Sequence, residues 1–472
     1  MIKSIVLFIN CFLVAGLNLV LFSQELTVEN LPGNWSGEME VSGSKLELVF
    51  KVQKSEDDKL SAILDVPAQG AYNLPVKNVE MINDSVFFHV EMIMGRYSGK
   101  MANDTTITGT WRQGDMDFQL SLTKTENTSE LKRPQTPQPP FPYSSEEVEY
   151  LNSVSGLKLA GTLAIPENAD NCPAVILITG SGAQDRDETI FGHKPFWVIA
   201  DYLTRNGIAV LRVDDRGVGA SEGNVNEATS EDFSFDVAAG LEFLKGRNEI
   251  DPAKIGLIGH SEGGLVAPMV ASQTEDVAFI VLLAGPGVPG EELLYEQIKL
   301  INRAAGVSEE QLAQNLKIQK AIFEIVRTEK DSAKRLDRLQ RTFSNGMYPM
   351  MQAEQKKAID MQLQSVNNPW FRYFLSCDPR PALRRVKCPV LALNGEKDLQ
   401  VPPKQNLPAV EKALNEVGNP NFKTMELENL NHLFQSCETG AISEYGQIEE
   451  TISPEVLEIM TEWIWDVVNE GK

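Results

Sequence analysis

The sequence predicts an α/β protein with a doubly wound, mostly parallel sheet and a helical cap, preceded by a small all-β domain. Three observations support this fold class. From residue 145 onward, apolar strand-like runs alternate with helical stretches, which is typical of a parallel sheet with helices on both faces. Residues 24–126 instead hold short alternating runs between Gly, Asn and Asp turns. A proline-rich stretch separates the two regions.

The N-terminal region, residues 24–126, is expected to be an antiparallel β unit, either a barrel or a sandwich. Its β-branched and alternating apolar residues mark short strands bounded by turn residues. We expect Trp35 and Trp111 to lie in its core. The expected strands are residues 46–52, 59–64, 85–92, 105–111 and 116–122.

Residues 1–23 resemble a secretory signal peptide. Lys3 supplies a positive start, an apolar run follows, and Ser23 gives a cleavage point before Gln24. Such a leader directs export, so we expect a periplasmic or extracellular protein of a bacterial envelope and no membrane span after cleavage. A retained membrane anchor is the alternative.

Residues 127–144 are expected to be a linker. They contain five prolines, with Gln and Thr between them. Such a composition is extended and semi-rigid. The linker is therefore expected to join the β domain to a second domain that spans residues 145–472.

The second domain is expected to consist of a central sheet and a helical insertion. About a hundred residues with helical spacing separate the strand-like runs 278–284 and 390–394. We expect this interval to form a helical cap at about residues 288–380. The other expected strands are residues 158–165, 174–179, 209–214, 254–258 and 422–427.

The most informative motif is Gly-x-Ser-x-Gly at residues 259–263, which lies between an apolar run and a stretch of small residues. A serine becomes a nucleophile at a sharp strand-to-helix turn, where its oxygen points away from the sheet. Gly259 and Gly263 lack Cβ atoms, so the strand and the helix can approach closely. The helix start also brings N–H groups to the place where an oxyanion would form. The motif therefore predicts Ser261 as a nucleophile.

A nucleophilic serine in this setting needs an acid and then a histidine later in the chain. Of the four histidines, only His432 lies downstream of Ser261 with room for an acid between them. We expect His260 to pack beside the turn. The expected acid is Asp398, with Glu396 as its rival, because it follows an apolar run at the place where the motif puts the acid. Asp398 would accept the Nδ1–H of His432 and stabilise the imidazolium.

An oxyanion hole needs two backbone N–H groups. One is expected from Glu262, the residue after the nucleophile. The other is expected from Ser181, with Gly182 as the alternative, because both follow the buried run at residues 174–179. A phosphate-cradling turn is a competing interpretation of this Gly-Ser-Gly segment, but the segment lacks the lysine of a P-loop.

With these motifs in place, residues 145–472, about two thirds of the chain, resemble the α/β-hydrolase superfamily. More narrowly, they are similar to secreted bacterial carboxylesterases and to serine aminopeptidase-like hydrolases. The resemblance implies a supporting role for Arg186 and Asp215, which lie on loops beside the site in such esterases, or a buried ion pair that holds those loops. The matching segments are residues 179–187, 214–221, 259–264, 394–398 and 431–432.

These features favour a serine hydrolase that cleaves carboxylic esters through Ser261, Asp398 and His432. A serine exopeptidase or acyltransferase with the same triad is the alternative, in which Glu262 would bind the free amine of a substrate. A binding module without activity is disfavoured because every catalytic element is present. A nucleotide-binding oxidoreductase would need an acid at the end of the next strand, but Asp276 precedes that strand.

Composition limits the partners. The net charge of −23 argues against binding to nucleic acid or to an anionic membrane. The chain has five cysteines, and no Cys/His cluster has the spacing of metal ligands. We therefore expect a small-molecule ester or a short peptide as substrate, and neither a metal nor another cofactor. The sequence does not specify an oligomeric state.

Overall fold

The computed structural model describes residues 28–470, except 42–43, 56–58, 68–70, 115, 127–131 and 345. The predicted signal peptide, residues 1–23, lies outside these residues, as does the first part of the predicted linker. The chain divides into two compact units. Met1–Val66 and Tyr72–Thr128 form the first, and Pro67–Ala71 and Ser129–Lys472 form the second.

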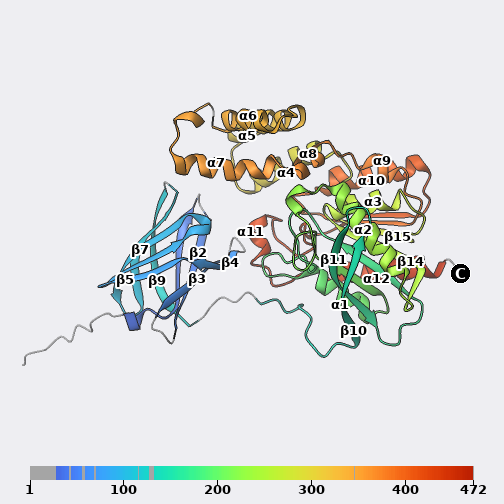
Figure 1. Ribbon diagram of the computed structural model, residues 1–472, viewed down its shortest axis with the longest axis horizontal. Helices are drawn as coiled ribbons and strands as arrows, with labels where there is room; N and C mark the ends of the chain where they lie inside the picture. The colour runs from blue at the N-terminus through green and yellow to red at the C-terminus, as the bar shows by residue number, and fades with distance from the viewer. Residues whose placement is uncertain are drawn as a thin grey trace, which may run out of the picture. The chain divides into compact units, whose positions relative to one another are not determined.

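The first unit is a nine-stranded, barrel-like antiparallel sheet with the strand order β4-β3-β2-β1-β9-β8-β7-β6-β5 (Figure 1). This confirms the predicted all-β domain. The strands are β1 (Gly33–Val41), β2 (Ser44–Lys54), β3 (Leu60–Val66), β4 (Ala71–Val76), β5 (Asn78–Ile82), β6 (Ser85–Val90), β7 (Gly95–Asn103), β8 (Thr106–Gln113) and β9 (Met116–Thr125).

Aromatic side chains fill the interior of this barrel. Trp35 and Trp111 are buried, as predicted. The ring of Phe50 stacks on Phe88 at a centroid distance of 4.5 Å and lies 6.1 Å from the ring of Trp111. Rings of this size bury enough apolar surface to hold a small β domain together.

The second unit is built on an eight-stranded sheet with the order β10-β11-β13-β12-β14-β15-β16-β17. β11 pairs antiparallel with β10 and β13, and the other neighbours are parallel. The doubly wound, mostly parallel sheet is thus confirmed. The strands are β10 (Tyr143–Asn152), β11 (Leu157–Pro166), β12 (Cys172–Ile178), β13 (Ala209–Val213), β14 (Ile250–His260), β15 (Phe279–Leu283), β16 (Val390–Gly395) and β17 (Phe422–Leu427).

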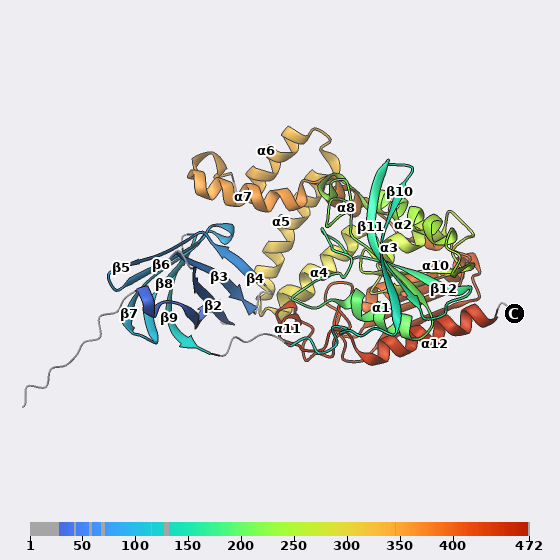
Figure 2. The ribbon, with the colours of Figure 1, turned by 60° about the horizontal axis from the view of Figure 1, so that its bottom comes forward.

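Helices cover both faces of this sheet (Figure 2). α2 (Ser230–Lys245), α3 (Gly263–Ala271) and α10 (Pro403–Val417) bury apolar side chains on one face. α1 (Pro195–Arg205) and α12 (Pro454–Glu470) bury theirs on the other. Side chains of the central strands contribute to both layers, which explains their continuous apolar sequences. Two short helices, α9 (Arg380–Leu383) and α11 (Ile442–Tyr445), lie in connections.

The predicted helical cap is formed by five helices between β15 and β16. They share an apolar core that includes Phe323, Leu339 and Phe371. α8 packs against α4 and α5 of the cap and also against α2 of the sheet layer. The cap helices are α4 (Gly290–Ala304), α5 (Glu309–Thr328), α6 (Ser332–Phe343), α7 (Ala353–Val366) and α8 (Pro369–Ser376).

The described part of the predicted linker is bound to the second unit. The guanidinium of Arg133 donates to the backbone carbonyls of Phe191, Gly446 and Ile448 at 2.8 to 3.0 Å. β10 begins at Tyr143, one residue before the predicted end of the linker at residue 144. No helix in the described residues is long and apolar enough to cross a membrane.

Candidate active site

Ser261 lies at a sharp turn between β14 and α3. Its φ of +52° is in the left-handed region, which is strained for a residue with a side chain and is characteristic of this kind of turn. A Cβ on Gly259 would come within 2.0 Å of the carbonyl oxygen of Gly263. A Cβ on Gly263 would come within 2.1 Å of the carbonyl oxygen of Ile178. Both glycines are therefore required by the close approach of strand, turn and helix.

Asp398 and His432 meet beside this turn. Nδ1 of His432 lies 2.8 Å from Oδ2 of Asp398. The other oxygen of Asp398 accepts hydrogen bonds from the N–H groups of Gln400 and Val401 at 2.8 and 2.9 Å. The rival acid, Glu396, is exposed and accepts from a backbone N–H elsewhere. Of the two candidate acids, Asp398 is the one that orients the histidine.

The loop that carries His432 is fixed by its own polar groups. Oδ1 of the buried Asn431 accepts from the N–H groups of Leu433 and Gln435, each at 3.0 Å. This side-chain turn replaces the hydrogen bonds that regular structure would supply. The backbone carbonyl of His432 accepts a further bond from Nε2 of His260 at 3.0 Å. The backbone of the base is thus held from two sides.

In the described structure, no hydrogen bond joins Oγ of Ser261 to His432. Ser261 is half-buried, whereas His432 is 4% exposed. A nucleophile and its base often come within hydrogen-bond distance only when substrate is bound. The Asp398–His432 hydrogen bond is therefore formed. It lies close to the nucleophile turn, because His260, the residue before Ser261, bonds to the backbone of His432.

The predicted oxyanion-hole donors lie on the two loops that flank Ser261. Among the described residues, the N–H groups of Glu262, Ser181 and Gly182 donate to no protein acceptor. The N–H of Gly180 differs, because it donates to Oε1 of Glu188 at 2.7 Å. A Cβ on Gly180 would lie 3.4 Å from Cβ of Ser261. The loop after β12 therefore passes directly beside Ser261. The next two N–H groups of this loop, those of Ser181 and Gly182, are available to donate to a ligand.

The side chain of Glu262 is fully buried behind the turn. Its Oε1 accepts from Oγ of Ser230 at 2.5 Å and from Nε1 of Trp370, in α8 of the cap, at 2.7 Å. Its Oε2 is buried without a partner among the described residues. Burial raises the pKa of the Glu262 carboxyl, although these two hydrogen bonds oppose the shift. Glu262, the predicted source of one oxyanion N–H, is therefore also tied to the cap through Trp370.

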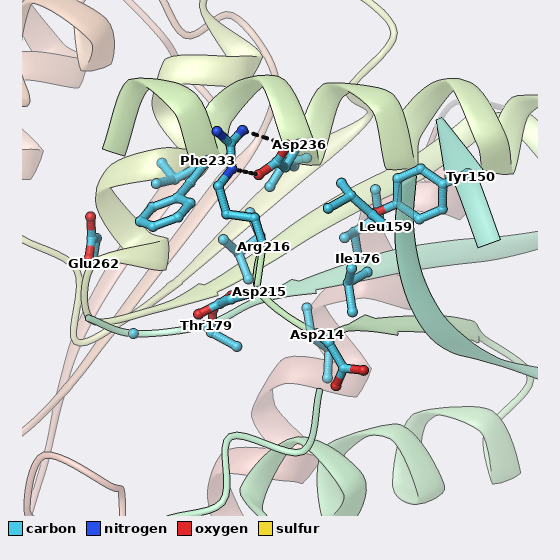
Figure 3. Close-up of a pocket in the computed structure, with 16 residues that line it drawn as sticks. Tyr150, Leu159, Ile176, Thr179, Asp214, Asp215, Arg216, Phe233, Asp236 and Glu262 are labelled. Carbon is cyan, nitrogen blue, oxygen red and sulfur yellow. Dashed lines mark hydrogen bonds and ion pairs between the residues drawn. The ribbon is translucent and has the colours of Figure 1, made fainter. Parts of the chain in front are cut away.

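Glu262 and Asp215 line a common cavity of about 40 Å³ (Figure 3). Asp215 accepts from Oγ1 of Thr179 at 2.7 Å and from the N–H of Gln184 at 2.9 Å. Burial raises the pKa of the Asp215 carboxyl and these two hydrogen bonds oppose the shift. The resulting pKa is about 7. The rest of the cavity wall is mostly apolar, and Phe233 lies beside Arg216 in it.

Arg186 does not pair with Asp215. Its guanidinium makes a two-pronged contact with Asp214, at 2.7 and 3.2 Å, and also donates to Glu147 and Thr162. Arg186 thus forms the buried ion pair expected to hold the loops, but with the neighbouring aspartate. Asp215 is held by neutral donors only, as far as the described residues extend.

Glu188 was not identified from the sequence, and Trp370 was expected only as a candidate for the lining of the acyl pocket or for packing of the cap. Glu188 receives the Gly180 N–H and pairs with His260, and Trp370 binds Glu262. The positive φ of Glu188, +52°, is not encoded by a glycine. In the described residues, no group of three or more His, Cys, Asp or Glu side chains could hold a metal ion.

Comparison with known proteins shows which family the sequence matches. Residues 173–435 match the family described as alpha/beta hydrolase fold. The chain is 28% identical to Esterase EstD of Thermotoga maritima over 298 residues, which are 63% of this chain and 62% of that esterase. It thus spans less than two thirds of that relative.

Shorter and more distant similarities were also found. The chain is 35% identical to the thiohydrolase aneE of Aspergillus aculeatus over 136 residues, 29% of this chain and 40% of that protein. The solved structure of the Pyrococcus furiosus esterase Pf2001 matches with a TM-score of 0.44 and 16% identity, covering 72% of this chain and 99% of that one. Because the family match spans more than half of the chain, the protein belongs to the α/β-hydrolase fold family.

Proposed function

We propose that this hydrolase cleaves carboxylic esters with short acyl chains through Ser261, His432 and Asp398. The observation that carries the proposal is that the strained serine, the Asp398–His432 pair and unpaired N–H groups lie around one turn. The similarity to an esterase supports an ester as the substrate.

The reaction follows from these placements. Oγ of Ser261 attacks the ester carbonyl carbon while Nε2 of His432 takes its proton, and Asp398 stabilises the resulting imidazolium. The N–H groups of Glu262 and Ser181 donate to the oxyanion. The carbon–oxygen bond of the ester then breaks, and the departing alkoxide receives the proton from His432. Water, activated by His432, hydrolyses the acyl-enzyme.

An exopeptidase is the second candidate, because Glu262 could receive the free amine of a peptide. Its carboxyl already accepts from Ser230 and Trp370, and its raised pKa favours the neutral form. A neutral carboxyl attracts an ammonium group less than a carboxylate does. These contacts favour the ester substrate.

The test is turnover of p-nitrophenyl esters of graded chain length, with aminoacyl-nitroanilides measured alongside. Ser261→Ala should lower kcat for short esters by roughly 10⁴-fold or more. Ser272→Ala, at the other end of α3, is the matched control and should keep wild-type activity. Full ester turnover in Ser261→Ala would contradict the proposal. Serine-dependent anilide cleavage without ester turnover would identify an exopeptidase instead.

A further inference from the structure

A buried histidine and a buried glutamate that the proposed chemistry does not use lie beside Ser261. His260 is 7% exposed and Glu188 is 4% exposed. Nδ1 of His260 lies 2.9 Å from Oε1 of Glu188. Together with the bonds to Gly180 and His432, this pair links three segments: the loop after β12, the end of β14 and the loop of the base.

The direction of each hydrogen bond between Gly180, Glu188, His260 and His432 follows from which groups can donate. A carbonyl oxygen only accepts, so Nε2 of His260 carries a proton and donates it to His432. Nδ1 then faces the Glu188 carboxyl, whose Oε1 also accepts from Gly180. Burial lowers the pKa of His260, but the charge and hydrogen bond of Glu188, the bond to the His432 carbonyl and the charge of Asp398 together raise it above its ordinary value. A carboxylate at Glu188 only accepts, and beside it His260 donates on both sides.

This arrangement is costly for a purely structural element. A buried ion pair gives little net stability compared with well-packed apolar side chains. The left-handed backbone of Glu188, with a φ of +52°, adds strain. The surroundings are apolar, with Phe196, Leu283 and Phe434 against the pair. Strained backbone conformations of this kind are concentrated at functional sites.

We propose that His260 and Glu188 are positioning residues that fix the base and the oxyanion loop relative to Ser261. The inference rests on the proposed function, because it concerns the same triad. Asp398 orients the ring of His432, and His260 holds its backbone. Glu188 holds Gly180, and so sets the position of the free N–H of Ser181. Misplacement of such groups by about 1 Å can cost 100-fold in rate.

Four variants separate positioning from simple packing. His260→Gln can place an amide N–H at the position of Nε2 and keep the bond to the His432 carbonyl, whereas the shorter amide of His260→Asn reaches only the position of Nδ1. Glu188→Gln keeps an acceptor for Gly180, whereas Glu188→Ala removes it. We expect kcat for a short p-nitrophenyl ester to fall roughly 10- to 100-fold in His260→Asn and Glu188→Ala, with KM within about threefold. His260→Gln and Glu188→Gln should retain kcat within about fivefold.

Asn419→Ala is the matched control. Asn419 is also buried, and its Nδ2 donates to the backbone carbonyls of Val386 and Cys388 at 3.2 and 2.9 Å, before the start of β16 and away from the triad. This variant should lower the melting temperature and leave kcat unchanged. The proposal is overturned if His260→Gln is as impaired as His260→Asn. It is also overturned if the variants lose melting temperature but keep kcat.

A second readout separates this inference from the proposed function. The rate at which a fluorophosphonate labels Ser261, with loss of fluoride, reports an activated serine without any ester substrate. Slow labelling in His260→Asn and Glu188→Ala, beside fast labelling of the wild type, supports positioning. Equal labelling rates in all variants overturn it. A wild type that neither labels nor hydrolyses esters would instead contradict the proposed function.

Discussion

At Gly263 the backbone leaves no room for a side chain. The nearest atom to an added Cβ is the carbonyl oxygen of Ile178 at 2.1 Å, and a backbone atom in a central strand cannot move aside. We therefore expect Gly263→Ala to displace the turn that presents Ser261. The free energy of unfolding should fall by roughly 3 kcal/mol, and ester turnover should fall with it.

The control for this prediction is Gly246→Ala, after the end of α2. An added Cβ there would meet its nearest atom at 3.4 Å, and its φ of −82° suits any residue. Urea denaturation should find it neutral or more stable by about 0.5 kcal/mol. Equal stability of the two variants would contradict the argument.

The candidate residues of the site could be named from the sequence because their order along the chain is informative. Ser261 lies in a motif whose glycines have a steric reason, and His432 is the one histidine placed to serve it. The partner of His260 could not be predicted in this way. Glu188 lies 72 residues before it and is brought near by the fold alone. Neither its left-handed backbone nor its buried carboxyl has a local sequence signal.

Among the elements, α8 connects the cap to the nucleophile turn through one indole N–H. Trp370→Phe keeps an aromatic ring, although a smaller one, and removes the donor to Oε1 of Glu262, whose Oε2 is without a partner among the described residues. Loss of a hydrogen bond to a buried acid costs about 1 to 3 kcal/mol. We therefore expect faster amide hydrogen exchange in α8, measured by mass spectrometry on the intact protein.

Trp463→Phe in α12 is the matched control, because its ring packs edge-on against Phe279 at the start of β15, away from the strand ends that carry the nucleophile turn. It should leave exchange in α8 unchanged. If Trp370→Phe also leaves that exchange unchanged, the indole bond does not hold the cap.

Strands with continuous or regularly alternating apolar sequences were predictable, and strands whose pattern is interrupted were not. β12 and β16 are buried along their whole length, so their sequences indicate strands directly. β1 and β7 were missed because glycine and polar residues interrupt their alternation. β10 was missed because its alternating acidic residues face solvent at the edge of the sheet.

For the whole molecule, the second unit contains ionisable groups that are buried and whose charge opposes folding at low pH. His193 is fully buried, with Nδ1 2.8 Å from Oγ1 of Thr451. Burial, helped by the nearby charge of Arg133, lowers the pKa of His193 from 6.5 to about 4. The unfolded chain therefore binds a proton that the folded chain does not bind between these two values.

The free energy of unfolding should therefore fall as the pH falls. A lowered folded-state pKa contributes stability that is present above pH 6.5 and is lost as the pH falls toward 4. One pKa unit corresponds to about 1.4 kcal/mol, so the wild type should lose roughly 2 to 3 kcal/mol through His193 in this window. His193→Gln cannot take up this proton. The difference in unfolding free energy between the two proteins, measured by urea denaturation from pH 7 to pH 4, should therefore shrink as the pH falls. A difference that stays constant across this range would mean that His193 titrates alike in the folded and unfolded chains.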